Sequence, residues 1–117
     1  MTTDARPTPP LTAAGFQVLL ALACGHGHGY AVMNFVERIT DGAVRIGPGT
    51  LYRTIARLAA DGLVIEVGGG DPAAPHDSRR RYYELTPLGR QAAASEATLL
   101  ARLTEAASTA GLLPTRR

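Results

Sequence analysis

The chain has 117 residues, of which 45% are hydrophobic, and a formal net charge of +2. This length suits one domain that buries roughly two-thirds of its unfolded surface, and the apolar fraction excludes a disordered chain. The small net charge excludes a global field that would draw the protein onto nucleic acid, so the placement of the basic residues matters more than their sum. All 12 of them are arginine, which a GC-rich coding bias explains at least as well as phosphate recognition does.

Cys24 is the only cysteine, so no intramolecular disulfide can form, as is usual in a reducing compartment. Residues 11–24 superficially resemble the core of a signal peptide. However, Asp4 lies beside the single preceding Arg6, three prolines stand at positions 7, 9 and 10, and the apolar run is too short to span a bilayer. We therefore expect a cytoplasmic protein with no membrane partner.

Residues 1–10 are polar and proline-rich and are expected to form a flexible arm. Thr12 can cap a first helix that runs to about Cys24. Its apolar side chains cover most of its circumference: Phe16, Val18, Leu19, Leu20, Leu22 and Ala23. Such a helix either lies centrally in the fold or gives one face to a partner subunit.

The Gly25-His-Gly-His-Gly29 run predicts a break, because glycine tolerates the positive φ angles of a tight connection. A second helix is expected over about residues 30–39, ending at Asp41-Gly42. Its spacing places Val32, Met33, Val36 and Ile39 inward and Glu37 and Arg38 outward. Residues 44–46 are expected to be short and extended.

Gly47-Pro48 predicts the start of a third helix, because proline is favoured in the first turn. Leu51, Ile55 and Leu58 form its expected buried stripe, and Asp61-Gly62 ends it. The complementary face carries Thr50, Arg53, Thr54 and Arg57.

Residues 63–67 alternate with the strand period, and residues 81–85 supply the answering strand of a hairpin. Parity places Tyr83 on the same face as Leu85, which is expected to be buried, and Arg80, Tyr82 and Glu84 on the other. The glycine-rich connection over residues 68–78 is long for a hairpin loop.

A last helix is expected from Pro87 towards Ala110. Seven positions alternate in steps of four and three, as in a coiled-coil seam: Ala92, Glu96, Leu99, Leu103, Ala106, Ala110 and Leu113. Glu96 interrupts this otherwise apolar seam. We expect this seam to pack against a second copy of the chain, with folding back onto the first helix as the alternative. The expected dimer interface comprises Phe16, Leu19, Leu99, Leu100, Leu103, Ala106 and Ala110.

These elements predict a mainly α chain with a small β-hairpin wing (α+β). Residues 1–10 are the arm, 11–86 a winged helix-turn-helix DNA-binding domain, 87–113 a C-terminal dimerisation helix and 114–117 a tail. Two cationic elements adjacent in sequence, the third helix and the hairpin, suit contact with a polyanion at two points.

Three motifs resemble the PadR-like family of transcriptional regulators, in its short form with one C-terminal helix. They are His28-Gly29-Tyr30, Pro48-Gly-Thr-Leu-Tyr52, and Arg80-Arg-Tyr-Tyr-Glu-Leu-Thr86 followed by Gly89-Arg90. The resemblance implies a dimeric winged-helix repressor that is often released by a small molecule. Gly47, Arg53 and the long wing loop depart from the family pattern, which affects DNA sequence preference rather than class.

The expected DNA contacts come from two places. The third helix offers Thr50, Tyr52, Arg53, Thr54 and Arg57, and the wing offers Arg79, Arg80, Arg81 and Tyr82. The first residues of a recognition helix approach the bases in the major groove. Tyr52 either donates its hydroxyl to a phosphate or packs beneath the wing. The alternative for the helix arginines is a merely solvated face.

Cys24, His26 and His28 alternate on a glycine-rich turn, a spacing that invites comparison with a metal site. Three ligands from five residues give poor tetrahedral geometry, however, so no metal and no cofactor is expected. No catalytic set is visible, and we expect no enzyme. The expected partners are double-stranded DNA, a second copy of the chain, and a small apolar effector in an aliphatic cleft between the first and last helices. The alternative function is a winged helix that binds an acidic protein partner.

Overall fold

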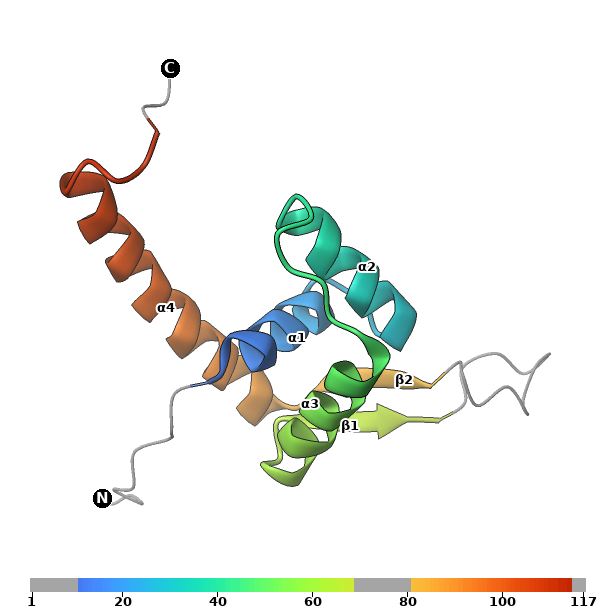
Figure 1. The fold of residues 1–117 in the computed structure, drawn as a ribbon. Coiled ribbons are helices and arrows are strands. Elements are labelled where there is room, and N and C mark those ends of the chain that lie inside the picture. Colours follow the sequence, from blue (N-terminus) through green and yellow to red (C-terminus); the bar gives the residue numbers. More distant parts are fainter. Residues whose placement is uncertain (1–10, 69–80, 115–117) are drawn as a thin grey trace, which may run out of the picture.

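The computed structural model describes residues 11–68 and 81–114. In chain order the elements are α1 (Ala13–Ala23), α2 (Gly29–Ile39), α3 (Pro48–Ala60), β1 (Val64–Val67), β2 (Tyr82–Leu85) and α4 (Pro87–Thr109) (Figure 1). The expected α+β class and the order of its elements are confirmed. The predicted arm over residues 1–10, most of the wing loop with Arg79 and Arg80, and residues 115–117 of the tail lie outside the described residues.

Side-chain caps start three of the four helices. The Thr12 hydroxyl accepts a hydrogen bond from the Gly15 amide (2.9 Å) at α1, and the Thr86 hydroxyl accepts one from the Gly89 amide (2.9 Å) at α4. At α2 the His28 Nδ1 atom accepts one from the Tyr30 amide (3.2 Å). Each cap satisfies an amide that the first helical turn leaves without a carbonyl partner.

The first helix, α1, lies in the middle of the fold (Figure 1). It contacts α2, α3, α4 and β2, and its buried residues are Gly15, Val18, Leu19, Ala21 and Leu22. Of the two placements expected for this helix, the central one is confirmed. Leu19 is fully buried within the single chain, so it offers no surface to a second copy and its expected role in a dimer interface is wrong. Phe16 remains half-buried.

The second helix packs through Val32, Phe35 and Val36. Ile39 is 62% exposed, so the expectation that it points inward is wrong. Ile39 continues the buried stripe by its spacing. It is the last residue of α2, however, and the elements that bury Val32 and Val36 do not cover this end of the helix. No strand forms over residues 44–46, although Ile46 is buried.

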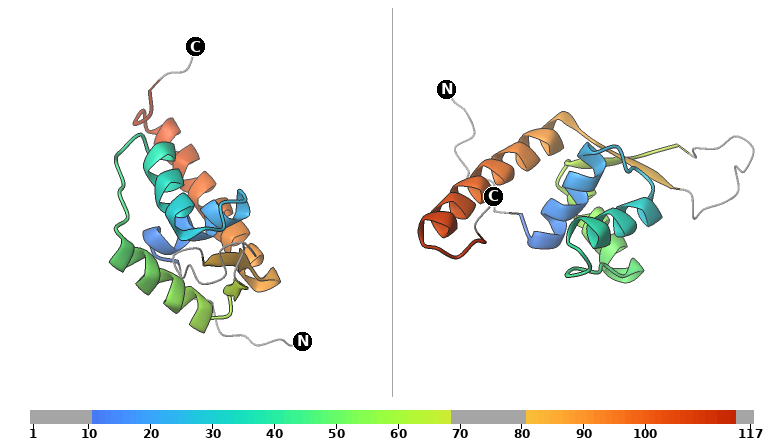
Figure 2. Two further views of the ribbon diagram at one scale, coloured as in Figure 1. Left: turned by 90° about the vertical axis from the view of Figure 1, so that its right-hand side faces the viewer. Right: turned by 90° about the horizontal axis from the view of Figure 1, so that it is seen from above.

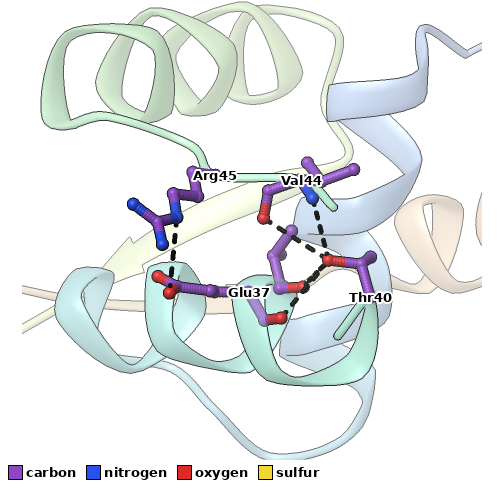
Figure 3. A network of polar contacts seen from close by, with 5 residues as sticks. Glu37, Thr40, Val44 and Arg45 are labelled. Carbon is purple, nitrogen blue, oxygen red and sulfur yellow. Dashed lines mark hydrogen bonds and ion pairs between the residues drawn. The ribbon is translucent and has the colours of Figure 1, made fainter. Parts of the chain in front are cut away.

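A hydroxyl-centred network turns the chain from α2 towards α3 (Figure 3). The Thr40 hydroxyl donates to the Val36 carbonyl (2.8 Å) and accepts from the Val44 amide (3.0 Å). Asp41 and Gly42 follow with φ angles of +53° and +81°, a conformation that glycine and aspartate tolerate better than most residues. The turn therefore fixes where the segment leading to α3 leaves α2.

The hairpin is antiparallel, with Val64 opposite Leu85 and Glu66 opposite Tyr83. Tyr83 is 5% exposed and Leu85 packs on the core, so the face assigned to them by parity is confirmed. The connection between α1 and α2 pairs with the outer edge of β2, as a short third strand would. The Gly27 carbonyl accepts a hydrogen bond from the Tyr83 amide (2.8 Å), and His28 forms an isolated bridge with Tyr82.

The last helix changes its surroundings along its length. Ala92 and Ala93 pack against the core, and α4 contacts α1 there. Further along, α4 extends away from the other elements (Figures 1 and 2), and Leu99, Leu100 and Leu103 are exposed. The alternative of folding back onto the first helix therefore holds for the first half of α4. The second half projects, and its packing against a second copy stays a prediction. None of the helices in the described segments is long and apolar enough to cross a bilayer.

A close backbone contact fixes where α4 begins. The Leu63 carbonyl accepts a hydrogen bond from the Thr86 amide (3.1 Å), and the Thr86 hydroxyl donates to the Gly62 carbonyl (2.6 Å). A Cβ atom placed at Gly89 would overlap the Leu63 carbonyl oxygen. Only glycine permits the first turn of α4 to lie against the end of α3 and the base of the hairpin.

We predict that Gly89→Ala lowers the free energy of unfolding by about 1–3 kcal/mol or more, because the added methyl group forces backbone atoms apart. Gly68→Ala is the matched control, because a Cβ atom there meets no heavy atom within 4 Å. Urea unfolding of both variants measures the difference. Equal unfolding midpoints for the two variants would contradict the proposed constraint.

Candidate nucleic-acid interface

The α3 helix divides into a buried stripe and an open polar face. Leu51, Ile55 and Leu58 are 5% exposed or less, which confirms the predicted stripe. On the opposite side Thr50, Arg53 and Arg57 are exposed and Thr54 is half-buried. The α3 sequence contains no acidic residue, so no carboxylate on the helix itself offsets the two guanidinium groups.

The start of α3 is the one helix start in the described residues that has no side-chain cap. Gly47 is the N-cap and Pro48 follows in the first turn. The Arg53 Nη2 atom lies 3.4 Å from the Thr50 hydroxyl oxygen, a long and therefore weak hydrogen bond. Arg53 thus reaches back towards the start of the helix and remains free to exchange this contact for another acceptor.

Tyr52 lies against the start of α2. A Cβ atom at Gly29 would come within 2.8 Å of the Tyr52 hydroxyl oxygen, so the absence of a side chain at Gly29 makes room for the phenol. Tyr52 is 41% exposed. Its ring therefore lies against the start of α2, and part of it still faces solvent. The two roles expected for Tyr52, a phosphate contact and packing beneath the wing, stay predictions.

Arg81 lies beside a carboxylate from the neighbouring strand. Its Nε atom is 3.7 Å from Oε2 of Glu66. Arg81 was predicted from the sequence to contact DNA from the wing, whereas no role was predicted for Glu66. The register places Glu66 opposite Tyr83, two residues from Arg81, so both charged groups share one face of the hairpin. Strand alternation alone could not give this pair, because positions 66 and 81 are assigned to one face only once the hairpin register is known.

Burial raises the pKa of Tyr83 above its ordinary value of 10.0, and the nearby Glu66 carboxylate raises it further. Tyr52 acts in the same direction, whereas Arg81 lowers the pKa through its charge and a side-chain hydrogen bond. Tyr83 is therefore a neutral phenol at physiological pH. The groups close to it come from α3 (Tyr52), from β1 (Glu66) and from the residue before β2 (Arg81).

The other residues expected to act from the wing have different surroundings. Tyr82 is half-buried, and its ring packs edge-on against the ring of His28 at a centroid distance of 5.5 Å. Tyr82 thus joins the hairpin to the start of α2. Arg79 and Arg80 lie outside the described residues, so their expected contacts with DNA stay predictions.

The cysteine and the histidines of the glycine-rich turn have separate roles. His26 stacks on Phe35 with a centroid distance of 4.9 Å, His28 caps α2, and Cys24 is an exposed free thiol. Within residues 11–68 and 81–114, no three histidine, cysteine or carboxylate side chains gather as metal ligands would.

A groove lies beneath the hairpin, between the turn that follows α1 and the first turn of α4. It has a volume of about 540 Å³ and is open to solvent along much of its length. Leu22 and Leu85 give it an apolar part, while Tyr82, Glu84 and Arg90 supply polar groups. The expected aliphatic cleft between the first and last helices is occupied where Ala92 and Ala93 pack on the core.

Three helices and a two-stranded hairpin, with the polar face of α3 open beside the hairpin, define a winged helix-turn-helix. Residues 18–95 match the transcriptional regulator PadR-like family. The chain belongs to this family of transcriptional regulators and has the winged-helix fold. The likeness expected from its three motifs is therefore confirmed.

Two curated relatives are similar to this chain. An uncharacterised 37.1 kDa protein of transposon Tn4556 from Streptomyces fradiae is 41% identical over 86 residues, which are 74% of this chain and 22% of that protein. Transcriptional regulator Rv3488 of Mycobacterium tuberculosis is 39% identical over 59 residues, 50% of this chain and 51% of that protein. The chain thus spans about a fifth and about half of the lengths of these relatives.

Two solved structures share the fold. BpsR of Bordetella bronchiseptica, whose DNA binding is regulated by 6-hydroxynicotinic acid, superposes with a TM-score of 0.67 and 30% identity over 93% of this chain and 72% of that chain. A PadR-like transcription factor from Bacteroides fragilis gives 0.62 and 20% over 81% of this chain and 86% of that chain.

Proposed function

We propose that the protein is a dimeric repressor that binds a near-palindromic operator in double-stranded DNA through α3. The observation that carries this proposal is the open face of α3, where Arg53 and Arg57 are exposed on a helix without acidic residues. A major groove admits one helix, and arginine can form two hydrogen bonds with guanine there. BpsR, which shares the fold, binds DNA, which supports the same role for this chain.

The second part of the proposal is the dimer. The projecting half of α4 exposes Leu99, Leu100 and Leu103 at 44%, 37% and 58%, and Ala106 and Ala110 continue the seam. Phe16 on α1 is half-buried and offers a smaller apolar surface. A twofold pairing of these apolar faces would place two copies of α3 in successive major grooves, about 34 Å or one helical turn apart. We infer that the wing arginines hold the flanking phosphates.

We predict that Arg53→Ala and Arg57→Ala each weaken binding of the dimer to the operator by about 2–6 kcal/mol, because each removes one base contact of about 1–3 kcal/mol from both subunits. Binding to unrelated duplexes falls much less. The operator comes from a selection of random duplexes by the purified protein, and fluorescence anisotropy then measures both affinities.

Arg102→Ala is the control, since it removes the same charge from an exposed position on α4. If the α3 variants left operator affinity unchanged, the assignment of base contacts to α3 would be wrong. If the wild type bound every duplex weakly and equally at physiological salt, the alternative role of a module for an acidic protein partner would be favoured.

We predict that Leu103→Glu converts the dimer to a monomer, because a buried carboxylate without a partner is strongly unfavourable in an interface. Leu88→Glu is the control: it is also on α4, is similarly exposed (53% against 58%) and lies in the first turn. Sedimentation velocity gives the masses. A dimeric Leu103→Glu protein would exclude this part of α4 from the interface.

We further propose that a small molecule with an apolar body releases the repressor from DNA, by binding in the groove beneath the hairpin. Leu22 and Leu85 suit the apolar body, and Arg90 offers a partner to an acidic substituent, while Glu84 of the same groove disfavours ligands with more than one negative charge. The regulation of BpsR by 6-hydroxynicotinic acid supports a small-molecule effector.

We predict that a ligand at a hundredfold excess over its Kd stabilises the protein by about 2.7 kcal/mol, read as a rise in the thermal midpoint. The first probes are 6-hydroxynicotinic acid and aliphatic carboxylates. Arg90→Ala, as control, should abolish the rise. Unchanged midpoints across these probes would count against the groove as an effector site.

A further inference from the structure

Glu66 places a negative charge on the surface that is proposed to meet DNA. Its carboxylate comes from β1, and the Arg81 guanidinium comes from the residue just before β2. Because Glu66 and Tyr83 are opposite in the register, Arg81 is the diagonal neighbour of Glu66 on the same face. The two side chains meet at 3.7 Å, at the end of the hairpin that leads into the wing.

The pair is exposed enough to open. The side chains of Arg81 and Glu66 are 56% and 51% exposed, and ion pairs of this kind contribute little net free energy because water already solvates both partners. A DNA phosphate is a stronger partner for the guanidinium, because release of a counterion from the duplex accompanies each contact. The same guanidinium can therefore serve either Glu66 or DNA.

We propose that Glu66 competes with DNA phosphates for the guanidinium of Arg81 and so weakens the sequence-independent part of DNA binding. The inference rests on the proposed DNA-binding function. As a consequence, the phosphate contacts of the wing contribute less to the binding free energy than three free arginines would. The base contacts of α3 then supply a larger share of that free energy. Glu66 acts through Arg81 and is a positioning residue rather than a contact to DNA.

The test is binding of Glu66→Gln to a random duplex as a function of salt. Because each subunit of the proposed dimer gains one phosphate contact, we expect affinity to rise about tenfold at about 50 mM salt, and the slope of log K against log salt to steepen by about 1.8, twice the value of about 0.9 for a single contact. The gain should then disappear near 200 mM salt. Affinity for the operator rises by the same factor, so the ratio of the two affinities stays the same.

Glu84→Gln is the matched control. Glu84 is an exposed carboxylate on β2, on the opposite face from Arg81, and its replacement changes the net charge equally. This variant should alter affinity less than twofold. In an Arg81→Ala background, Glu66→Gln should also have no effect, because the group that Glu66 restrains is gone.

The outcomes separate the two proposals. If the wild type binds duplexes but Glu66→Gln leaves affinity and salt slope unchanged, or acts equally with and without Arg81, the competition is wrong and the DNA-binding function stands. If the wild type binds no duplex, both fail. Glu66→Ala serves as a second variant, and thermal midpoints establish that each protein compared is folded.

Discussion

The contact between the first turn of α4 and the carbonyl of Leu63 is the constraint on which the functional arrangement depends. It requires glycine at position 89 and is reinforced by the two hydrogen bonds of Thr86 with Gly62 and Leu63. Gly62 and Leu63 follow α3, and Thr86 follows the hairpin, so three elements meet within a few residues. The helix with the exposed leucines therefore leaves the domain in a direction fixed relative to the helix with the exposed arginines. A dimer built on α4 would inherit that direction and would set the separation of its two DNA-facing helices without any further part of the chain.

Within the part of the chain that the structure describes, an arginine on each side of α3 lies beside a glutamate. Arg45, before α3, lies 3.5 Å from Glu37, and Arg81, after the wing loop, lies 3.7 Å from Glu66. The α3 helix holds two arginines and no carboxylate. The net charge of +2 therefore understates the local field at α3 and describes the flanking segments better. Such a distribution would weaken attachment to any duplex, because phosphate contacts position a protein on DNA but carry no sequence information.

Local signals in the sequence were sufficient for the helices and the hairpin. Thr12, Thr86 and Pro48 mark helix starts by chemistry that operates within one turn, and strand alternation sets the face of Tyr83. Long-range features were beyond these signals. The burial of Leu19 depends on α1 being covered from several sides, and the exposure of Ile39 depends on where its neighbours end. The turn after α1 pairs with β2 through a backbone hydrogen bond, which the pattern of side chains in the sequence cannot predict. The Arg81–Glu66 pair needs the hairpin register, which a long loop leaves open in the sequence.

The start of α3 is stabilised differently from the starts of the other helices. Where they use a hydrogen bond from a backbone amide to a capping side chain, α3 uses the restricted φ angle of Pro48. A covalent restriction of this kind leaves the peptide groups of the first turn unoccupied by the protein's own side chains. An incoming molecule can approach this end of the helix without first displacing an internal ligand, and the helix keeps its form whether or not that molecule is present.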